Sequence, residues 1–281
     1  MGIKTNSSLM VDAHRYAATP MSKLLRYDDT AVVITGGAKG IGYAMACRFA
    51  ELGATMTLID IDPELTQRSS QIALKYGVKV NSVYGDVRDS TITETAASKA
   101  YGSHVDRLVW VNNAGIYPTN LIEDMSDADW VRVIDLDLTA TFYGCRAAAS
   151  AIRSRNGTGV ILNISSTAGF RVGNPPGISH YASAKHGVQG LTKALAFELG
   201  RDGIRVVCIA PGTVITEGLL QKFGTNVSET DDPYVRLSAR MPIQRASLPD
   251  DVARTAVFLA SDAAAMITGA IIPVDAGHLV L

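Results

Sequence analysis

Tyr181 and Lys185, four residues apart, are the pair in this sequence with the clearest chemical potential. On a helix, residues at this spacing lie on one face, one turn from each other. An ammonium beside a phenol stabilises the phenolate, which prepares the tyrosine to exchange a proton with an alcohol or a carbonyl oxygen. Ser166, upstream, could hydrogen-bond the same oxygen. Because Tyr-x-x-x-Lys pairs also occur on solvated helix faces, the meaning of this pair depends on the other motifs.

A glycine-rich segment, residues 36–42, lies between a short apolar run at 31–35 and a helical pattern. Such a turn lets backbone approach a pyrophosphate, and the helix N-terminus supplies free N–H groups. A second apolar run, 54–59, ends in Asp60, where a carboxylate can accept hydrogen bonds from the adenosine ribose and would repel the extra phosphate of NADP. Lys39, inside the turn, could attract that phosphate. We give Asp60 more weight because the strand end fixes its position, so the predicted cofactor is NAD rather than NADP.

Strands and helices alternate along the rest of the chain. The expected helices are residues 63–76, 91–101, 127–155 (one long helix or two abutting ones), 180–199 and 250–259, and the further expected strands are 78–84, 107–111, 159–164, 204–210 and 270–274. This alternation predicts right-handed crossovers and ligands at the carboxyl ends of parallel strands. The predicted fold class is therefore α/β: one doubly wound Rossmann-type domain, a parallel sheet of about seven strands with helices on both faces.

Two segments fall outside this alternation. Residues 1–29 show no clean period, and the sequence leaves open whether they form a tail or an arm packed on a neighbouring subunit. Residues 217–248 interrupt the pattern with charges, Gly224, Pro233 and Pro242. Long irregular segments inside a compact domain are often lids or binding loops, so we expect a substrate-binding loop here, within a catalytic domain that spans 30–281.

Composition excludes several classes of protein. The chain has 281 residues, of which 47% are hydrophobic and 19% are charged, so it can bury a sizeable core. Its net charge is −1, and the sequence contains no stripe of basic residues that would bind nucleic acid. No apolar run reaches the length of a membrane helix, and the N-terminus does not resemble a signal peptide, so the expected location is cytoplasmic. The widely spaced Cys47, Cys145 and Cys208 indicate buried thiols rather than a metal site or disulfides.

Taken together, these residues resemble the short-chain dehydrogenase/reductase family from about Thr30 to the C-terminal residue. The resemblance rests on Thr-Gly-x-x-x-Gly-x-Gly at 35–42, Asn-Asn-Ala-Gly at 112–115, Ser166, Tyr181, Lys185 and Pro211-Gly212, in this order and at about the family's spacing. It implies that Tyr181 is the general acid/base and that Lys185 supports its phenolate and holds the nicotinamide ribose. Ser166, rather than Ser165, would orient the substrate oxygen.

The resemblance also implies a set of cofactor contacts. Asp60 would hold the adenosine ribose, Asp86 and Val87 would flank the adenine, and Asn113 would steady the central strands. Val214 and Thr216 would meet the nicotinamide carboxamide. The full cofactor set is Gly36, Lys39, Gly40, Ile41, Gly42, Asp60, Asp86, Val87, Asn113, Ala114, Gly115, Tyr181, Lys185, Pro211, Gly212, Val214 and Thr216.

Asp137 departs from the family pattern, which usually has an asparagine at this position. The asparagine would hold a water in a proton relay behind the lysine. A carboxylate can accept from that water but cannot donate, and it places a negative charge near Lys185, where an ion pair could blunt the effect of the lysine on Tyr181. We therefore include Asp137 in the catalytic set and expect an altered pH dependence.

The predicted function is an NAD(H)-dependent oxidoreductase that interconverts a secondary alcohol and a ketone. The candidate substrate residues are Tyr117, Phe170, Arg171, Asn174, His180 and Glu217. This mixed polar set loosely fits a polyol or a sugar-like substrate. The alternatives are an NADPH-dependent reductase of 3-oxoacyl thioesters, which Asp60 disfavours, and a non-catalytic NAD-binding sensor, which the retained Tyr181 and Lys185 disfavour. The expected partner is a small molecule, with neither nucleic acid nor membrane.

A row of small residues on the helix expected at 180–199 also suggests self-association. Ala184, Gly187, Gly190 and Ala194 would lie on one face, which suits close packing against another subunit. The family resemblance implies a homo-oligomer, a tetramer or a dimer.

Overall fold

One parallel sheet organises the computed structural model, which describes residues 18–101, 105, 107–173, 176–223, 235, 238–239 and 241–281. Its strands are β1 (Thr30–Thr35), β2 (Thr55–Asp60), β3 (Val80–Tyr84), β4 (Arg107–Asn112), β5 (Thr158–Ile164), β6 (Ile204–Pro211) and β7 (Ile271–Val274). The seven strands lie in the order β3-β2-β1-β4-β5-β6-β7, and every neighbouring pair is parallel. The predicted fold class is confirmed.

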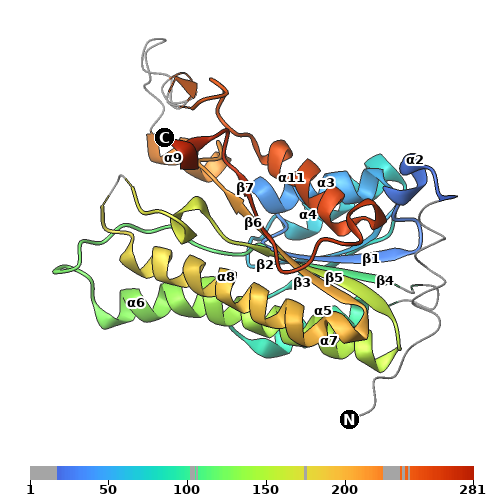
Figure 1. The fold of residues 1–281 in the computed structure, drawn as a ribbon. Helices are drawn as coiled ribbons and strands as arrows, with labels where there is room; N and C mark the ends of the chain where they lie inside the picture. The colour runs from blue at the N-terminus through green and yellow to red at the C-terminus, as the bar shows by residue number, and fades with distance from the viewer. Residues whose placement is uncertain are drawn as a thin grey trace.

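Helices cover both faces of this sheet (Figure 1). The helices are α2 (Met21–Leu24), α3 (Gly40–Glu51), α4 (Leu65–Tyr76), α5 (Ser90–Ala100), α6 (Asp127–Ile134), α7 (Ala140–Ser154), α8 (Ser179–Leu199), α9 (Glu217–Phe223) and α11 (Pro249–Ala260). Figure 1 shows α3, α4 and α11 on one face and α5, α7 and α8 on the other. No helix among these described parts of the chain is long and apolar enough to cross a bilayer.

Alternation along β1 explains why the sheet needs helices on both sides. Val32 and Ile34 belong to the core cluster that includes Phe49 of α3, whereas Ala31 and Val33 belong to the cluster that includes Ile152 of α7. Successive strand residues point to opposite faces, so a strand buried on both faces must be apolar at nearly every position. The chain winds outward in both directions from β1 and β4, and their carboxyl ends border the crevice where such folds bind ligands.

Residues 127–155 form one continuous helical segment that is interrupted in the middle by a π-helical turn. α6 passes into a π-helical turn, Asp135–Thr139, and then directly into α7. Single π turns within α-helices re-aim side chains and are frequent at functional sites. The π turn contains Asp137, so it is the structural feature most relevant to the site.

Two segments differ from the sequence expectations. Residues 217–223, expected to be irregular, form the short helix α9, while most of 224–240 lies outside the described residues. In the N-terminal extension, residues 1–17 lie outside the described part, but Tyr27 is anchored to the domain. Its side chain is buried and its hydroxyl donates to the carbonyl oxygen of Val257 at 2.5 Å. The packed domain therefore begins a few residues before the predicted boundary at 30.

Candidate active site

Close backbone packing makes glycine necessary in the turn after β1. Gly36 and Gly40 have φ values of +65° and +56°, in the left-handed region that favours glycine. A Cβ atom added at Gly42 would lie 1.9 Å from the carbonyl oxygen of Gly36. The turn therefore folds back against the first residues of α3, leaving the helix N-terminus open to an anionic group.

Side chains of β1 and β4 hold this turn against the Asn113–Gly115 segment. The Asn113 side chain donates to the carbonyl oxygens of Thr35 and Gly36 at 3.0 and 3.1 Å. Thr35 Oγ1 accepts the backbone N–H groups of Asn113 and Ala114 at 2.9 and 3.0 Å. Thr35, Val87 and Ala114, among others, surround a small gap at this junction that is too narrow for a water molecule. The structure thus brings together three regions that the sequence assigned to the cofactor.

The carboxylate of Asp60 is held at the end of β2 by backbone hydrogen bonds. It accepts from the N–H groups of Ala38 at 2.9 Å and Asp62 at 3.0 Å. Lys39 forms an ion pair with Asp62 at 2.8 Å and lies 3.7 Å from Glu64, so two carboxylates face the only lysine of the turn. The electrostatic balance of this corner is therefore negative.

The segment after β6 closes over the glycine turn. Thr216 accepts the N–H of Leu219 and so caps α9, and its methyl group lies 3.5 Å from the position of a Cβ atom built on Gly40. Val214 forms an isolated parallel bridge with Ser247. Gly212 packs against Asp275, where an added Cβ atom would approach to 2.9 Å. Asp86, in contrast, is paired with Arg88 by hydrogen bonds of its carboxylate.

Lys185 and Asp137 form a fully buried ion pair beside Tyr181. The Nζ atom of Lys185 lies 2.9 Å from Asp137 Oδ1 and donates to the carbonyl oxygen of Ile164 at 3.2 Å. It lies 5.5 Å from the centroid of the Tyr181 ring. The exposed fractions of Asp137 and Lys185 are 0% and 4%. The expected ion pair therefore exists, and it involves the residue at which the chain departs from the family pattern.

Two opposing effects set the charge of Lys185. Burial lowers its pKa, but the nearby charges of Asp137 and Tyr181 and the hydrogen bond to Asp137 outweigh it, so the net pKa is raised above the ordinary lysine value. Lys185 thus keeps its ammonium charge in a buried site. Because this charge is already balanced by Asp137, the carboxylate controls how much of it Tyr181 experiences.

Backbone geometry explains how a carboxylate fits behind Lys185. The second oxygen of Asp137 accepts the N–H of Ile116 at 3.1 Å. A Cβ atom added at Gly115 would lie 2.5 Å from Asp137 Oδ1 and 3.5 Å from Lys185 Nζ, so only glycine leaves room for the pair. The π-helical turn supplies the side-chain direction, and the glycine supplies the space.

The two adjacent serines have different environments. Ser165 is buried, and its hydroxyl donates to the carbonyl oxygen of Lys185 at 2.9 Å, which ties β5 to α8. Ser166 is half-buried and its hydroxyl accepts the N–H of Ala168 at 3.1 Å, so its own proton is not used in that bond. This geometry suits Ser166, as the sequence predicts, for donating a hydrogen bond to a substrate oxygen.

Known proteins with similar sequences and folds cover most of this chain. The family model described as enoyl-(acyl carrier protein) reductase matches residues 36–278. The 3-oxoacyl-(acyl-carrier-protein) reductase FabG of Chlamydia muridarum is 36% identical over 252 residues, which is 88% of this chain and 96% of the relative. The 2-(S)-hydroxypropyl-CoM dehydrogenase 3 of Xanthobacter autotrophicus is 35% identical over 256 residues, 90% of this chain and 97% of the relative. This chain belongs to the short-chain dehydrogenase/reductase family.

A solved member of the same family shows the same fold. A candidate NAD(P)-dependent gluconate 5-dehydrogenase from Beutenbergia cavernae, with NADP bound at low occupancy, has a TM-score of 0.80 at 32% identity, covering 92% of this chain and 99% of the other. As a short-chain dehydrogenase/reductase, the present protein is an oxidoreductase that acts on CH–OH groups or the corresponding ketones.

The predicted substrate residues of this dehydrogenase/reductase lie in different environments in the described part of the chain. Tyr117 packs edge-on against Tyr181, with ring centroids 5.0 Å apart. Phe170 follows Ser166 by four residues, and its side chain is partly exposed. Arg171 donates instead to the carbonyl oxygen of Leu281. Asn174 lies outside the described residues.

His180 departs most clearly from its predicted role. Its ring has an exposed fraction of 0%, and its Nδ1 atom accepts the backbone N–H of Tyr181 at 2.9 Å. α8 needs this acceptor because its N-cap residue, Ile178, makes no side-chain hydrogen bond to the first turn. A fully buried ring cannot contact substrate in this conformation, so the geometry makes His180 a positioning residue for Tyr181.

We expect His180→Leu to lower kcat about tenfold or more and His180→Asn to restore most of it. Asparagine carries its Oδ1 acceptor on Cγ, where histidine carries Nδ1, whereas leucine has similar size and no acceptor. Steady-state kinetics and NAD binding of both variants, with thermal unfolding to show that both fold, provide the measurement. Equal loss in the two variants would mean that lost packing, not the hydrogen bond, is responsible.

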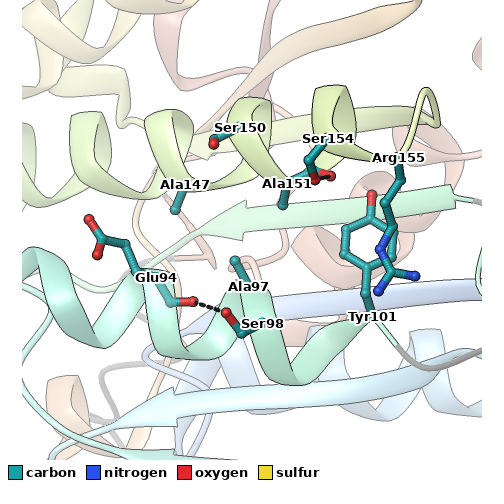
Figure 2. A pocket seen from close by; sticks show the side chains of 9 residues that line it. All are labelled: Glu94, Ala97, Ser98, Tyr101, Ala147, Ser150, Ala151, Ser154 and Arg155. Carbon is teal, nitrogen blue, oxygen red and sulfur yellow. Dashed lines mark hydrogen bonds between the residues drawn. The ribbon is translucent and has the colours of Figure 1, made fainter.

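A cavity in the described parts of the chain lies away from this site, between α5 and α7 (Figure 2). It measures about 430 Å³ and is lined mainly by small residues, with Tyr101 and Arg155 at one end and Glu94 at the other. The Arg155 guanidinium lies 4.5 Å from the centroid of the Tyr101 ring, and burial raises the Tyr101 pKa to about 12. None of its lining residues was a sequence-predicted site residue.

The row of small residues on α8 is only partly a surface. Ala184 is buried, and an added Cβ atom at Gly187 would lie 2.8 Å from Leu138, so these two pack inside the chain. Gly190 has open space around its Cβ position, and Ala194 is exposed. At most the second half of the row is therefore available to another subunit.

Sequence reasoning missed three contributors to the site. Thr35 uses its hydroxyl to join the glycine turn to β4, and a hydroxyl residue directly before the glycines was the available signal. Ile116 and Ile164 contribute a backbone N–H and a backbone carbonyl to Asp137 and Lys185. Backbone contributions leave no trace in side-chain identity, so sequence alone could not show them.

Proposed function

We propose that the protein is an NAD(H)-dependent dehydrogenase of a secondary alcohol, or reductase of the ketone, with Tyr181 as general acid/base. The observation that carries the proposal is the buried Asp137–Lys185 pair beside the Tyr181 ring. A tyrosine hydroxyl held beside a buried ammonium can exchange a proton with the alcohol or ketone oxygen. Ser166, with an uncommitted proton, donates to the same substrate oxygen and stabilises its developing charge.

The residues around the glycine turn fit a dinucleotide. A pyrophosphate needs close backbone approach, and Gly36, Gly40 and Gly42 leave the space that Cβ atoms would fill. Asp60 at the end of β2 receives the adenosine ribose, and the Thr216 segment beside Gly40 receives the nicotinamide end. When bound, NAD supplies the hydride acceptor, while Tyr181, Lys185 and Ser166 position the substrate and manage its proton.

The charges at the end of β2 support NAD over NADP. Asp60 presents a carboxylate, and Lys39, the cation that could attract a ribose phosphate, is paired with Asp62 and lies near Glu64. A solved relative holds NADP at low occupancy, so the fold alone does not exclude NADP, and we infer the preference for NAD from these side chains. They also disfavour the alternative of an NADPH-dependent reductase of 3-oxoacyl thioesters.

We expect the wild-type protein to use NAD with at least tenfold higher kcat/KM than NADP. Asp60→Asn should narrow this ratio about tenfold, because the amide keeps an acceptor for the backbone and removes the repelling charge. Asp62→Asn should narrow it less, because it only releases Lys39. Initial rates with each cofactor, at saturating alcohol and two salt concentrations, give the ratio. A wild-type preference for NADP would contradict the cofactor assignment.

The proposed reaction is tested with purified protein and a panel of secondary alcohols and ketones. Formation or loss of NADH, followed by absorbance, reports turnover in either direction. The proposal expects turnover of at least one class. Tight NAD binding without turnover of any alcohol or ketone would favour the non-catalytic sensor instead.

A further inference from the structure

Two of the polar side chains that suggested a polyol substrate are used elsewhere in the fold, and Asn174 lies outside the described residues. His180 is fully buried in the first turn of α8, and Arg171 donates to the carbonyl oxygen of Leu281. Glu217, at the start of α9, lies on the cofactor side, with its Oε2 atom 3.9 Å from a Cβ position built on Gly40. A polyol needs several hydrogen-bonding partners beyond the one at its reacting carbon, because each unpaired hydroxyl in a closed site is costly.

Large apolar side chains are exposed at the mouth of the site, alongside polar ones such as Glu123 and Arg171. Two loops meet there: Asn120 donates its backbone N–H to the Gly177 carbonyl at 2.8 Å, and a Cβ atom on Gly177 would touch the Asn120 backbone at 3.0 Å. Figure 1 shows both loops, which follow β4 and β5, at the same edge of the sheet as α9. The large apolar residues exposed on these loops are Tyr117, Leu121, Ile122, Phe170 and Val172.

This apolar surface begins at the catalytic phenol. The Tyr117 ring packs edge-on against the Tyr181 ring at 5.0 Å, and burial raises the Tyr117 pKa above its ordinary value. Phe170 is 45% exposed and Val172 55% exposed, on the loop that begins at Ser166. Exposed apolar residues gathered around a catalytic group mark a surface that is covered when its ligand binds.

We propose that the substrate is a secondary alcohol or ketone whose reacting carbon carries an apolar body, an alkyl chain or a carbocyclic ring system, and that it is not a polyol. Phe170 and Val172 determine this specificity by packing against the apolar body, while Tyr117 forms the wall nearest the reacting carbon. The proposal rests on the proposed function, since it concerns the same site, and it replaces the sugar-like substrate that the sequence indicated.

A homologous series of 2-alkanols, from 2-butanol to 2-octanol, tests the substrate class. A second comparison uses cyclohexanol and myo-inositol, which share a six-membered carbon ring but differ in the number of hydroxyl groups. We expect kcat/KM with NAD to rise about fourfold for each added methylene until the chain leaves the loops, which is the increment expected for a buried CH₂ group. Cyclohexanol should be turned over at least a hundredfold better than the inositol. No dependence on chain length, or better turnover of the polyol, would overturn the proposal.

Variants locate the effect on the loops. Phe170→Ser should at least halve the slope of log kcat/KM against chain length. Phe258→Ser is the matched control, since Phe258 is 41% exposed but lies on α11, away from these loops, and it should leave the slope unchanged. Equal slopes in Phe170→Ser and wild type would overturn the role of Phe170.

A binding measurement separates failure of the substrate class from failure of the reaction. Affinities of 2-alkanones for the protein–NADH complex are measured by NADH fluorescence. Affinity that rises with chain length, without turnover, would support the apolar site and remove the oxidoreductase assignment. Turnover with affinities and rates that do not change with chain length would support the oxidoreductase assignment and remove the apolar substrate site.

Discussion

Tyr181→Phe should lower kcat by about 10² to 10⁴-fold, the usual contribution of a positioned proton-transfer group, while changing NAD affinity little. The substitution removes the hydroxyl that we propose exchanges the substrate proton. It keeps the ring that packs against Tyr117 at 5.0 Å and lies beside Lys185. The expected loss therefore falls on the chemical step. Stopped-flow measurement of NADH formation, with NAD binding by fluorescence or calorimetry, separates the two quantities.

Tyr117→Phe is the matched control for this experiment. It removes a second phenolic hydroxyl from the same edge-on ring pair and leaves the packing in place. We expect it to keep kcat within about threefold of wild type, because general acid–base catalysis requires only the hydroxyl that reaches the substrate oxygen. A Tyr181→Phe protein with near-wild-type kcat, or a Tyr117→Phe protein with the larger loss, would show that the proton-transfer group has been wrongly assigned.

Asp137→Leu should destabilise the fold by about 3–5 kcal/mol, the range found when one partner of a buried ion pair is removed. Lys185 would remain 4% exposed with its charge unbalanced, apart from the carbonyl of Ile164. Asp137→Asn should cost less, because the amide can still accept the Ile116 N–H. Asp135→Leu is the matched control, because Asp135 lies two residues earlier, is partly exposed and forms no ion pair with any residue that the structure describes. Urea unfolding at pH 7 measures all three.

The stabilisation that the Asp137–Lys185 ion pair gives the fold depends on pH in a defined direction. The pKa of folded Lys185 is raised, so the pair stabilises the wild-type fold fully below the ordinary lysine pKa of about 10.4 and loses that stabilisation only as pH rises through the folded value. In Asp137→Asn the carboxylate is gone and burial dominates, which lowers the Lys185 pKa. The alkaline limb of the pH–rate profile should then begin at lower pH than in wild type. An unchanged profile would show that Asp137 does not control the charge of Lys185.

Strand and helix periodicity was sufficient to predict most of the sheet because β1, β4, β5 and β6 are buried on both faces and read as nearly continuous apolar runs. The motif residues around Gly36, Asn113 and Lys185 converge because carboxyl ends of parallel strands meet at one edge. The Asp137–Lys185 contact was also expected from a single substitution in the family pattern. These features depend on local sequence or on the topology that local sequence implies.

The remaining features depend on contacts between distant segments. The π turn at Asp135–Thr139 has no periodic signature, because one extra residue in a helical turn leaves the apolar spacing nearly unchanged. His180 read as a polar pocket residue, but the missing cap at Ile178 directs its ring inward. Arg171 likewise read as a substrate contact, and its partner lies 110 residues away at Leu281. Side-chain type indicated polarity at these positions but not where that polarity would be used.

The distance from the Tyr181 hydroxyl to the substrate oxygen in a crystal structure of the protein with NAD and an alcohol inhibitor is the most direct test of this account. The account predicts a separation of about 2.6–3.2 Å, with Ser166 Oγ in hydrogen-bond reach of the same oxygen and Lys185 still paired with Asp137. A ternary complex in which the Tyr181 hydroxyl faces away from the bound alcohol, or in which another group holds that oxygen in its place, would contradict it.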